Sequence, residues 1–387
     1  MKKLRVVMFS TSALAGAPIR IAQAINAHTD IEVRLIDLQR WDIFEHDHVH
    51  DENPELSLEI AREADVIHLF NYLDARSKEF YPIDFSALEK SGKKLIRMFE
   101  STPMLVAKNM GIPLDEVLYD PIPQLVIAQY PERFYPRARV VPNIIPQNQN
   151  NYLPESVENK WSVTFTPSWQ RSAWDARWDT KGVPETLAMM KRVSRHAKLP
   201  VKVISGRPFP EVMQAKRESS LVIDELVTGS YHLSGLEGLS LGKPTLGYVD
   251  ARTQRVLRWI SGSQTCPFVS VRMEDAEHVI RYLLDNDVER EEIGQQGREW
   301  IEHYWNDKCL VKHYEDVYEK LMDNPENICR QPDLTLSTSR DKFFAITLPD
   351  QIYYSRKRRG IKERGFFVRC KDTILDCLRS VKKRYFS

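Results

Sequence analysis

Residues 224–244, DELVTGSYHLSGLEGLSLGKP, are the most informative stretch of this 387-residue sequence. They predict the end of a buried strand, a loop with glycine and serine, a short helix beginning near Ser234-Gly235, and a turn into the next strand at Gly242-Lys243-Pro244. Free backbone N–H groups and the helix dipole favour an anion at such a helix start. A diphosphate suits this position, and Glu237, one turn into the helix, can accept two hydrogen bonds from a ribose diol.

Short apolar runs alternate with helical patterns on both sides of this stretch. The runs are continuous, as in parallel strands that are buried on both faces. Together they predict two Rossmann-like, doubly wound α/β domains that face a central cleft, followed by a basic C-terminal helical extension. Strands are expected at 5–9, 32–36, 66–70, 94–99, 125–128 and 140–141, and again at 161–166, 201–205, 221–223, 245–249 and 268–271.

The domain boundaries follow from composition. Residues 147–160 are polar, carry one proline and have no apolar period, which is typical of a linker. We therefore expect a first domain over 1–146 and a second over 161–323. Residues 324–387 are expected to form a connector and a basic amphipathic tail.

The stretch 224–244 resembles the donor loop of the family 4 retaining glycosyltransferases, which have the GT-B architecture. That family carries a glutamate-x7-glutamate pair whose second glutamate binds the donor ribose, and Glu237 matches it. The first glutamate is missing, because Gly229 stands eight positions earlier. Tyr231 and His232 are the expected substitutes. The resemblance further implies donor-binding positions at the helix start, namely Leu233, Ser234, Gly235 and Leu236.

Two cations after the first strand of the second half are a further point of resemblance. The family places an arginine and a lysine there, both touching the donor diphosphate, and Arg171 and Lys181 follow Ser168 in this sequence. The leaving nucleoside diphosphate gains negative charge, which fixed cations stabilise. We expect Arg171, Lys181 and His232 to be catalytic and Ser168 to bind donor, with Arg177 as an alternative to Arg171.

The first half carries weaker signals. Gly16 lies between the first strand and its helix, where the family has a glycine-rich loop near the phosphates, and a plain tight turn explains it equally well. The acceptor-side histidine that the family has near the end of the strand at 94–99 is absent. Arg97 or Glu100 is expected to serve in its place.

No metal or cofactor is expected beyond the nucleotide-sugar co-substrate. The one Asp-x-Asp spacing in the sequence, Asp285-Asn286-Asp287, lies at the junction of two expected helices, so we identify no triad of the kind that metal-dependent transferases carry. Residues 46–51, HDHVHD, suggest a zinc site as one alternative, since alternating ligands can bind zinc from a strand. Because no second cluster accompanies them, a solvated acceptor-side loop is the favoured interpretation.

Charge is concentrated at the C-terminal end. The net charge is +1, but residues 351–387 hold twelve Lys/Arg and three acidic residues, so the first 350 residues carry −8. Residues 356–386 are therefore expected to dock on an anionic membrane surface or to pack on the protein itself. No apolar run of about 18 residues exists, and the short run after Met1 predicts a strand rather than a secretory signal. A cytoplasmic protein, peripheral at the inner face of the membrane and without a nucleic-acid partner, is expected.

Together these features predict a metal-independent hexosyltransferase. It would move a sugar from a nucleotide-diphosphate sugar to a glycan or lipid-linked acceptor, with retention, in surface polysaccharide or glycoconjugate biosynthesis. Two alternatives stay open: a nucleotide-sugar epimerase of the same fold, and a catalytically silent nucleotide-sugar-binding subunit. The sequence names neither the sugar, the base nor the acceptor.

Overall fold

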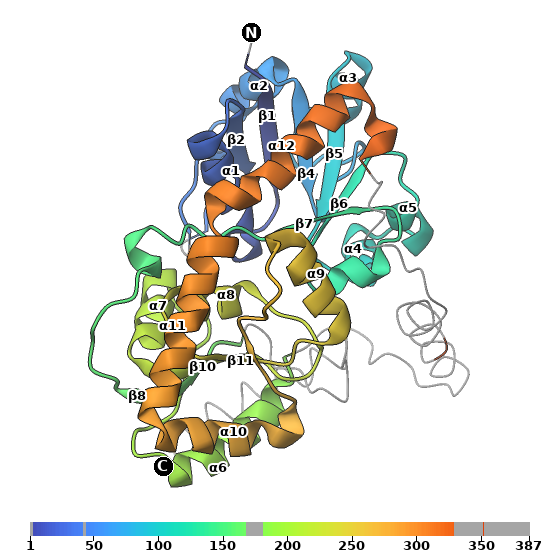
Figure 1. Ribbon diagram of the computed structural model, residues 1–387. Coiled ribbons are helices and arrows are strands. Elements are labelled where there is room, and N and C mark those ends of the chain that lie inside the picture. The colour runs from blue at the N-terminus through green and yellow to red at the C-terminus, as the bar shows by residue number, and fades with distance from the viewer. Residues whose placement is uncertain (1–2, 42–43, 168–180, 329–350, 352–387) are drawn as a thin grey trace, which may run out of the picture. The chain divides into compact units, whose positions relative to one another are not determined.

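The computed structural model describes residues 3–41, 44–167, 181–328 and 351. The elements described below lie within one compact unit, residues 1–334 (Figure 1). They are built on two parallel sheets, one of seven strands and one of five. The two sheets confirm the expected pair of Rossmann-like halves, while the expected tail at 356–386 lies outside the described residues.

The first sheet has the strand order β3-β2-β1-β4-β5-β6-β7, and every neighbouring pair in it is parallel. The strand order reverses between β1 and β4, and open α/β sheets bind ligands at the carboxyl ends of strands near such a reversal. The strands are β1 (Arg5–Ser10), β2 (Glu32–Asp37), β3 (His48–Val49), β4 (Val66–Phe70), β5 (Lys94–Phe99), β6 (Gln124–Ile127) and β7 (Arg139–Val141).

Helices cover both faces of the first sheet. One face packs on α2 and α3 through a cluster that includes Phe9, Leu69 and Phe85. The other face packs on α1 and on α12 (Asp307–Asp323), and α12 runs alongside α1 across the sheet (Figure 1). The helices of this half are α1 (Ala17–His28), α2 (Pro54–Glu63), α3 (Phe85–Lys90), α4 (Pro103–Met110) and α5 (Leu114–Leu118).

The second sheet has the strand order β12-β11-β10-β8-β9, with β10 at its centre. All seven residues of β10 are buried, and the apolar run Leu221–Ile223 lies at its centre. Its strands are β8 (Trp161–Phe165), β9 (Lys202–Val203), β10 (Ser219–Glu225), β11 (Thr245–Gly247) and β12 (Val269–Ser270). Its helices are α6 (Val183–His196), α7 (Phe209–Arg217), α8 (Leu233–Ser240), α9 (Ala251–Ser261), α10 (Met273–Asp285) and α11 (Asp287–Tyr304), and α12 (Asp307–Asp323) follows.

The expectation for residues 46–51 is wrong in one respect. They do not form only a solvated loop, because His48–Val49 is the edge strand β3, paired with Ile36 and Asp37. The histidine rings also have protein partners: His46 contacts Asp37, His48 contacts Ser57, and His50 contacts the Tyr81 carbonyl oxygen. A two-residue strand of polar character has no apolar run to reveal it.

The last long helix returns to the first half of the chain. In α12, the Tyr318 hydroxyl lies 2.8 Å from Nδ1 of His68 on β4, and the Tyr314 hydroxyl donates to the Pro142 carbonyl oxygen. Both tyrosines are fully buried, in an apolar cluster that also holds Leu236 and Val256 from the second half. The two halves therefore share one continuous core, and the boundary at residue 323 stays a prediction.

The chain crosses between the halves twice, and hydrogen bonds tie the two crossings together. Arg298 of α11 donates through Nη1 to the carbonyl oxygens of Gln147, Tyr152 and Ser240. The Trp305 indole N–H donates to the Asn143 carbonyl oxygen at 3.0 Å. The segment at 143–152 is thus fixed to the end of α11.

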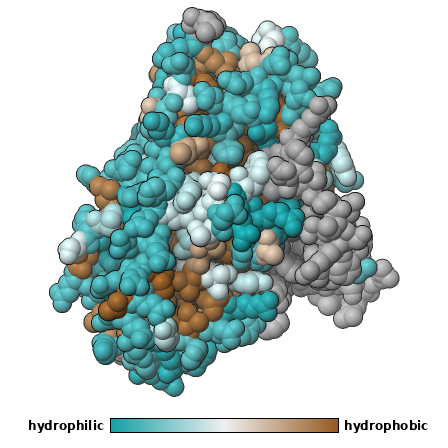
Figure 2. All heavy atoms as spheres, in the orientation of Figure 1, coloured by the Kyte–Doolittle hydropathy of each residue, from teal (hydrophilic) through white to brown (hydrophobic). Residues whose placement is uncertain are grey.

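The visible surface is mostly hydrophilic, and its larger apolar area lies over the second half (Figure 2). Among the helices of the described residues, none combines the length and the apolar character needed to cross a bilayer.

Candidate active site

The start of α8 lies at the carboxyl edge of the second sheet. Ser234 Oγ is 2.6 Å from Oγ1 of Thr166, which directly follows β8. The His232 backbone N–H donates to Asp224 Oδ2 at 2.7 Å, and Asp224 lies at the end of β10. A side chain at Gly235 would meet that carboxylate at 2.7 Å, so glycine allows α8 to approach the strand. Adjacent strand ends thus hold the helix start that the sequence placed near Ser234.

The loop before α8 is fixed by a buried carboxylate. Glu225 accepts backbone hydrogen bonds from Val227 and Thr228 at Oε2 and from Ser230 at Oε1. Burial raises the pKa of Glu225, although His232 and these N–H groups act against the rise. Sequence reasoning missed Glu225, which sets the loop conformation on both sides of Gly229.

Lys181 lies beside the same helix start. Its Nζ donates to Asp224 Oδ1 at 3.0 Å, and the His232 ring lies 3.6 Å from that oxygen. Burial raises the pKa of Asp224, but Lys181 and His232 outweigh it and hold the pKa well below its ordinary value. The structure therefore brings together two of the three residues expected to be catalytic. The third, Arg171, lies outside the described residues, as do Ser168 and Arg177.

Glu237 is the centre of a buried charge network. Its Oε2 accepts from Lys216 Nζ at 2.6 Å and its Oε1 from Arg20 Nη2 at 3.3 Å. Lys216 also donates to the carbonyl oxygen and the hydroxyl of Ser234. Burial raises the pKa of Glu237, and the two cations lower it further than burial raises it. For the Lys216 ammonium, burial has the opposite effect and lowers the pKa, although Glu237 opposes that shift.

Sequence reasoning missed both cations of this network. Arg20 lies on the apolar stripe of α1 with Ala17, Ile21 and Ala24, and a charged residue on a buried stripe is a usable signal. Lys216 follows Met213 by three positions on the buried side of α7, which is a similar signal. Neither pattern shows that the two cations meet at Glu237.

Three consecutive residues of the loop between β1 and α1 have a left-handed backbone, and only one of them is glycine. Leu14 and Ala15 have φ values of 44° and 54°, and Gly16 has 79°. Non-glycine residues adopt this region at an energetic cost, and such strain tends to occur at functional sites. A side chain at Gly16 would lie 2.7 Å from the Phe44 ring, so glycine is required there.

The two acceptor-side candidates have different surroundings. Arg97 is fully buried, donates to Asp120 and lies with Cζ 4.8 Å from the Phe99 ring centroid. Its guanidinium is therefore engaged within the first half. Glu100 is held by its backbone N–H, which donates to Asn71 Oδ1 at 2.7 Å, and its Oε1 is buried without a hydrogen-bond partner among the described residues. Burial raises the pKa of Glu100 to about 8, against the opposing charge of Arg20.

The raised pKa of Glu100 predicts a pH-dependent stability. Its ordinary value is 4.5 and its folded value about 8, so the folded protein binds this proton more tightly than the unfolded chain. The resulting stabilisation is complete below about pH 4.5 and is lost as the pH rises through 8. We expect the melting temperature of the wild type, relative to Glu100→Gln, to fall between pH 5.5 and 8.5. Exposed Glu299→Gln serves as the control, and a difference independent of pH would contradict this assignment.

Three expected donor-binding residues have buried side chains. Tyr231 is fully buried, with its ring 5.8 Å from that of Phe268 and 6.1 Å from that of Trp305. Its hydroxyl has no hydrogen-bond partner in the part of the chain that the structure describes. Leu233 and Leu236 belong to the same apolar cluster. The two leucines can therefore offer a ligand only their backbone groups, and their donor-binding role stays a prediction.

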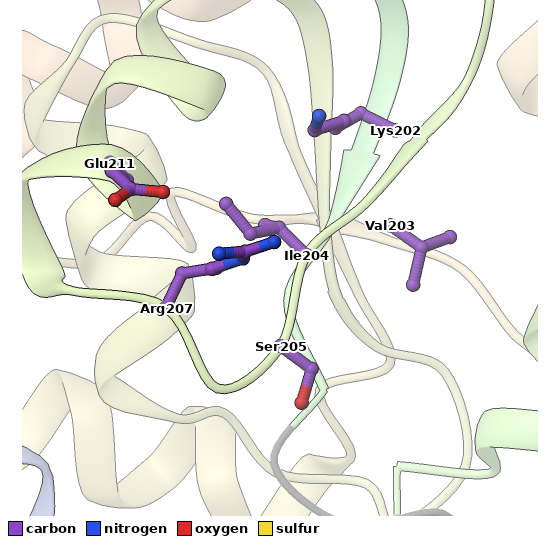
Figure 3. Close-up of a pocket in the computed structure, with 6 residues that line it drawn as sticks. All are labelled: Lys202, Val203, Ile204, Ser205, Arg207 and Glu211. Atoms are coloured by element: carbon purple, nitrogen blue, oxygen red, sulfur yellow. The ribbon is translucent and has the colours of Figure 1, made fainter.

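An open cavity of about 440 Å³ lies at the carboxyl end of β9 (Figure 3). Its walls come from the strand, the following loop and the beginning of α7, and the lining residues are Lys202, Val203, Ile204, Ser205, Arg207 and Glu211. None of the expected site residues that the structure describes lines it. Within the described ranges, no group of three or more His, Cys, Asp or Glu side chains is arranged to hold a metal ion.

Two parallel Rossmann-like sheets joined by a double crossing define the GT-B architecture. Solved structures with the same fold include an α-glucosyltransferase in complex with UDP-glucose and DNA containing an abasic site, with a TM-score of 0.59 and 10% identity over 82% of this chain and 100% of that one. A sucrose-phosphate synthase from Thermosynechococcus elongatus matches with a TM-score of 0.52 and 10% identity over 83% of this chain and 100% of that one.

A glycosyltransferase from Rickettsia africae matches with a TM-score of 0.51 and 11% identity over 84% of this chain and 100% of that one. At these identities the likeness establishes the fold alone. No protein-family model matches the sequence, and the comparison with curated proteins finds no match.

Proposed function

We propose that the protein is a glycosyltransferase that moves a hexose-type sugar from a nucleotide-diphosphate sugar to a glycan or lipid-linked acceptor. One observation carries the proposal: the start of α8 lies at the sheet edge with Lys181, Lys216 and Arg20 around it and Glu237 one turn inside. Backbone N–H groups and these cations suit a diphosphate, and a carboxylate suits a ribose diol. The fold neighbours with bound UDP or UDP-glucose support the same ligand class.

The proposed chemistry is transfer with retention and without a metal. The bond between the anomeric carbon and the phosphate oxygen breaks while the acceptor oxygen bonds the same face of the sugar. The departing phosphate oxygen takes the acceptor proton, so no protein nucleophile is needed. Lys181 stabilises the charge on the leaving group, with Arg171 as its proposed partner. Glu100, protonated at neutral pH, orients the acceptor hydroxyl by hydrogen bonding.

Thermal unfolding with a panel of nucleotide sugars tests the ligand class. A donor at 100 times its dissociation constant should stabilise the folded state by about 2.7 kcal/mol, with free sugars and nucleosides as controls. Slow donor hydrolysis without acceptor should accompany binding. Binding without any turnover would favour the silent binding subunit, and no binding to any member of the panel would remove the proposal.

Metal independence is a separate expectation. Because Lys181 and its neighbouring cations supply positive charge at the α8 start, treatment with EDTA followed by desalting should leave turnover unchanged. The measurement is the initial rate before and after treatment, with and without added manganese or magnesium. Loss of activity that manganese restores would place the leaving-group charge on a metal and contradict this prediction.

The cellular setting is proposed from the sequence. We infer a role in surface polysaccharide or glycoconjugate biosynthesis at the cytoplasmic face of a membrane, with residues 356–386 docking on anionic lipid. Sedimentation with anionic liposomes at low and high salt measures that docking.

A further inference from the structure

Arg20 enters the charge network from the first half of the chain. It is 5% exposed and lies on α1, four residues after Gly16. Three aromatic rings surround its guanidinium, with Cζ 5.6 Å from the ring centroid of Phe44, 5.5 Å from that of Tyr152 and 5.0 Å from that of Phe209. Such contacts hold a cation in place without using its hydrogen-bond donors.

The guanidinium of Arg20 is incompletely hydrogen-bonded. Nη2 donates to Glu237 Oε1 at 3.3 Å, a long contact for a buried ion pair, and Nη1 makes no hydrogen bond among the described residues although it is buried. A buried donor without an acceptor is unfavourable, and an arginine fork matches two oxygens of a phosphate. Nη1 of Arg20 thus has free donor capacity beside Glu237, one turn inside α8.

Glu237 does not depend on Arg20 alone for its charge balance. Lys216 lies 2.6 Å from the other carboxylate oxygen, in the same half of the chain and fully buried. If Arg20 moves to another anion, Lys216 still neutralises Glu237 and one carboxylate oxygen becomes available. That oxygen is the group that the proposed donor ribose requires.

We propose that Arg20 exchanges the Glu237 carboxylate for the diphosphate of the donor, so that one movement supplies a phosphate-binding cation from the first half and frees Glu237 for the ribose. This inference rests on the proposed function, because it takes a nucleoside diphosphate as the ligand. Arg20 is then a donor-binding residue that couples the two halves to donor binding. The coupling requires the diphosphate and not the base or ribose.

Calorimetric titration of the full-length protein with UDP, GDP and ADP identifies the diphosphate that the wild type binds, and the matching nucleoside is titrated in parallel. Arg20→Gln should weaken diphosphate binding about 10- to 100-fold, as expected for loss of one charge-assisted contact. It should not weaken nucleoside binding, because Arg20 then no longer occupies the Glu237 carboxylate. Arg20→Lys keeps the charge and loses the planar fork of donors. Its affinity for the diphosphate should therefore lie between those of the wild type and Arg20→Gln.

Arg252→Gln is the matched control. Arg252 also joins the two halves, through Nε and Nη2 to the Glu132 carboxylate at 3.0 and 2.7 Å, and it lies on α9 rather than α8. Arg252→Gln should leave the affinity for the diphosphate within about twofold of the wild-type value. Melting temperatures of all variants establish that each one is folded.

The outcomes are separable. Wild-type diphosphate affinity in folded Arg20→Gln, with Lys181→Ala impaired, would overturn the role of Arg20 and leave the proposed function standing. An equal loss for diphosphate and nucleoside would also overturn it, because the effect would not follow the phosphates. Failure of the wild type to bind any of the three diphosphates would remove both the inference and the proposed function.

Discussion

Glu237→Ala is expected to lower kcat/KM by about 10²–10³-fold, because the proposed ribose loses its carboxylate partner in a buried site. The same change leaves Lys216 buried without its counter-ion, which typically costs about 3–5 kcal/mol of unfolding free energy. Steady-state kinetics with the donor selected by thermal shift measures the first effect, and urea unfolding measures the second.

Two variants separate the effects on activity and stability. Glu237→Gln keeps the shape of the side chain and can still hydrogen-bond Lys216. Compared with Glu237→Ala, it should therefore regain more of the unfolding free energy than of kcat/KM. Glu299→Ala removes an exposed glutamate from α11 and should change neither quantity. A folded Glu237→Ala protein with wild-type kcat/KM would exclude Glu237 from the donor site.

Lys181→Ala is expected to reduce turnover by about 10²–10³-fold, since it removes a fixed cation from the leaving diphosphate. Asp224 would also lose its closest cation while remaining buried, so the pKa of that carboxyl should rise towards its ordinary range. The measurements are single-turnover rates at saturating donor and the affinity for the nucleoside diphosphate.

The control for Lys181 is Lys191→Ala, which removes an exposed lysine from α6. It should be indistinguishable from the wild type. Unchanged turnover in Lys181→Ala, with the protein folded, would show that the leaving group is stabilised elsewhere.

Most of the fold was predictable because its strands are buried on both faces. Val66–Phe70 and Lys94–Phe99 match the expected ranges, and the other strands differ from theirs by a few residues at the ends. Burial on both faces produces an apolar run whatever the neighbours are, so the signal is local. The edge strand His48–Val49 was not predicted, because only two residues form it and they make no apolar run.

The site was only partly predictable, since it is assembled from distant segments. Glu237 and Lys181 stand out through local spacing around a helix start. Arg20 meets Glu237 across 217 positions, and no periodicity within one helix can indicate such a partner. The left-handed backbone at Leu14 and Ala15 was also unpredictable, because residues other than glycine rarely adopt it and the surrounding structure must hold them there.

The tied crossings at Arg298 and Trp305 have a mechanical consequence. Two chain segments that are hydrogen-bonded side by side resist sliding and twisting, and they leave rotation about their common line as the easiest relative motion. We therefore expect the joint to act as a hinge in any relative motion of the two halves. A motion that separated them would also have to break ion pairs between the halves such as Arg20–Glu237 and Arg252–Glu132.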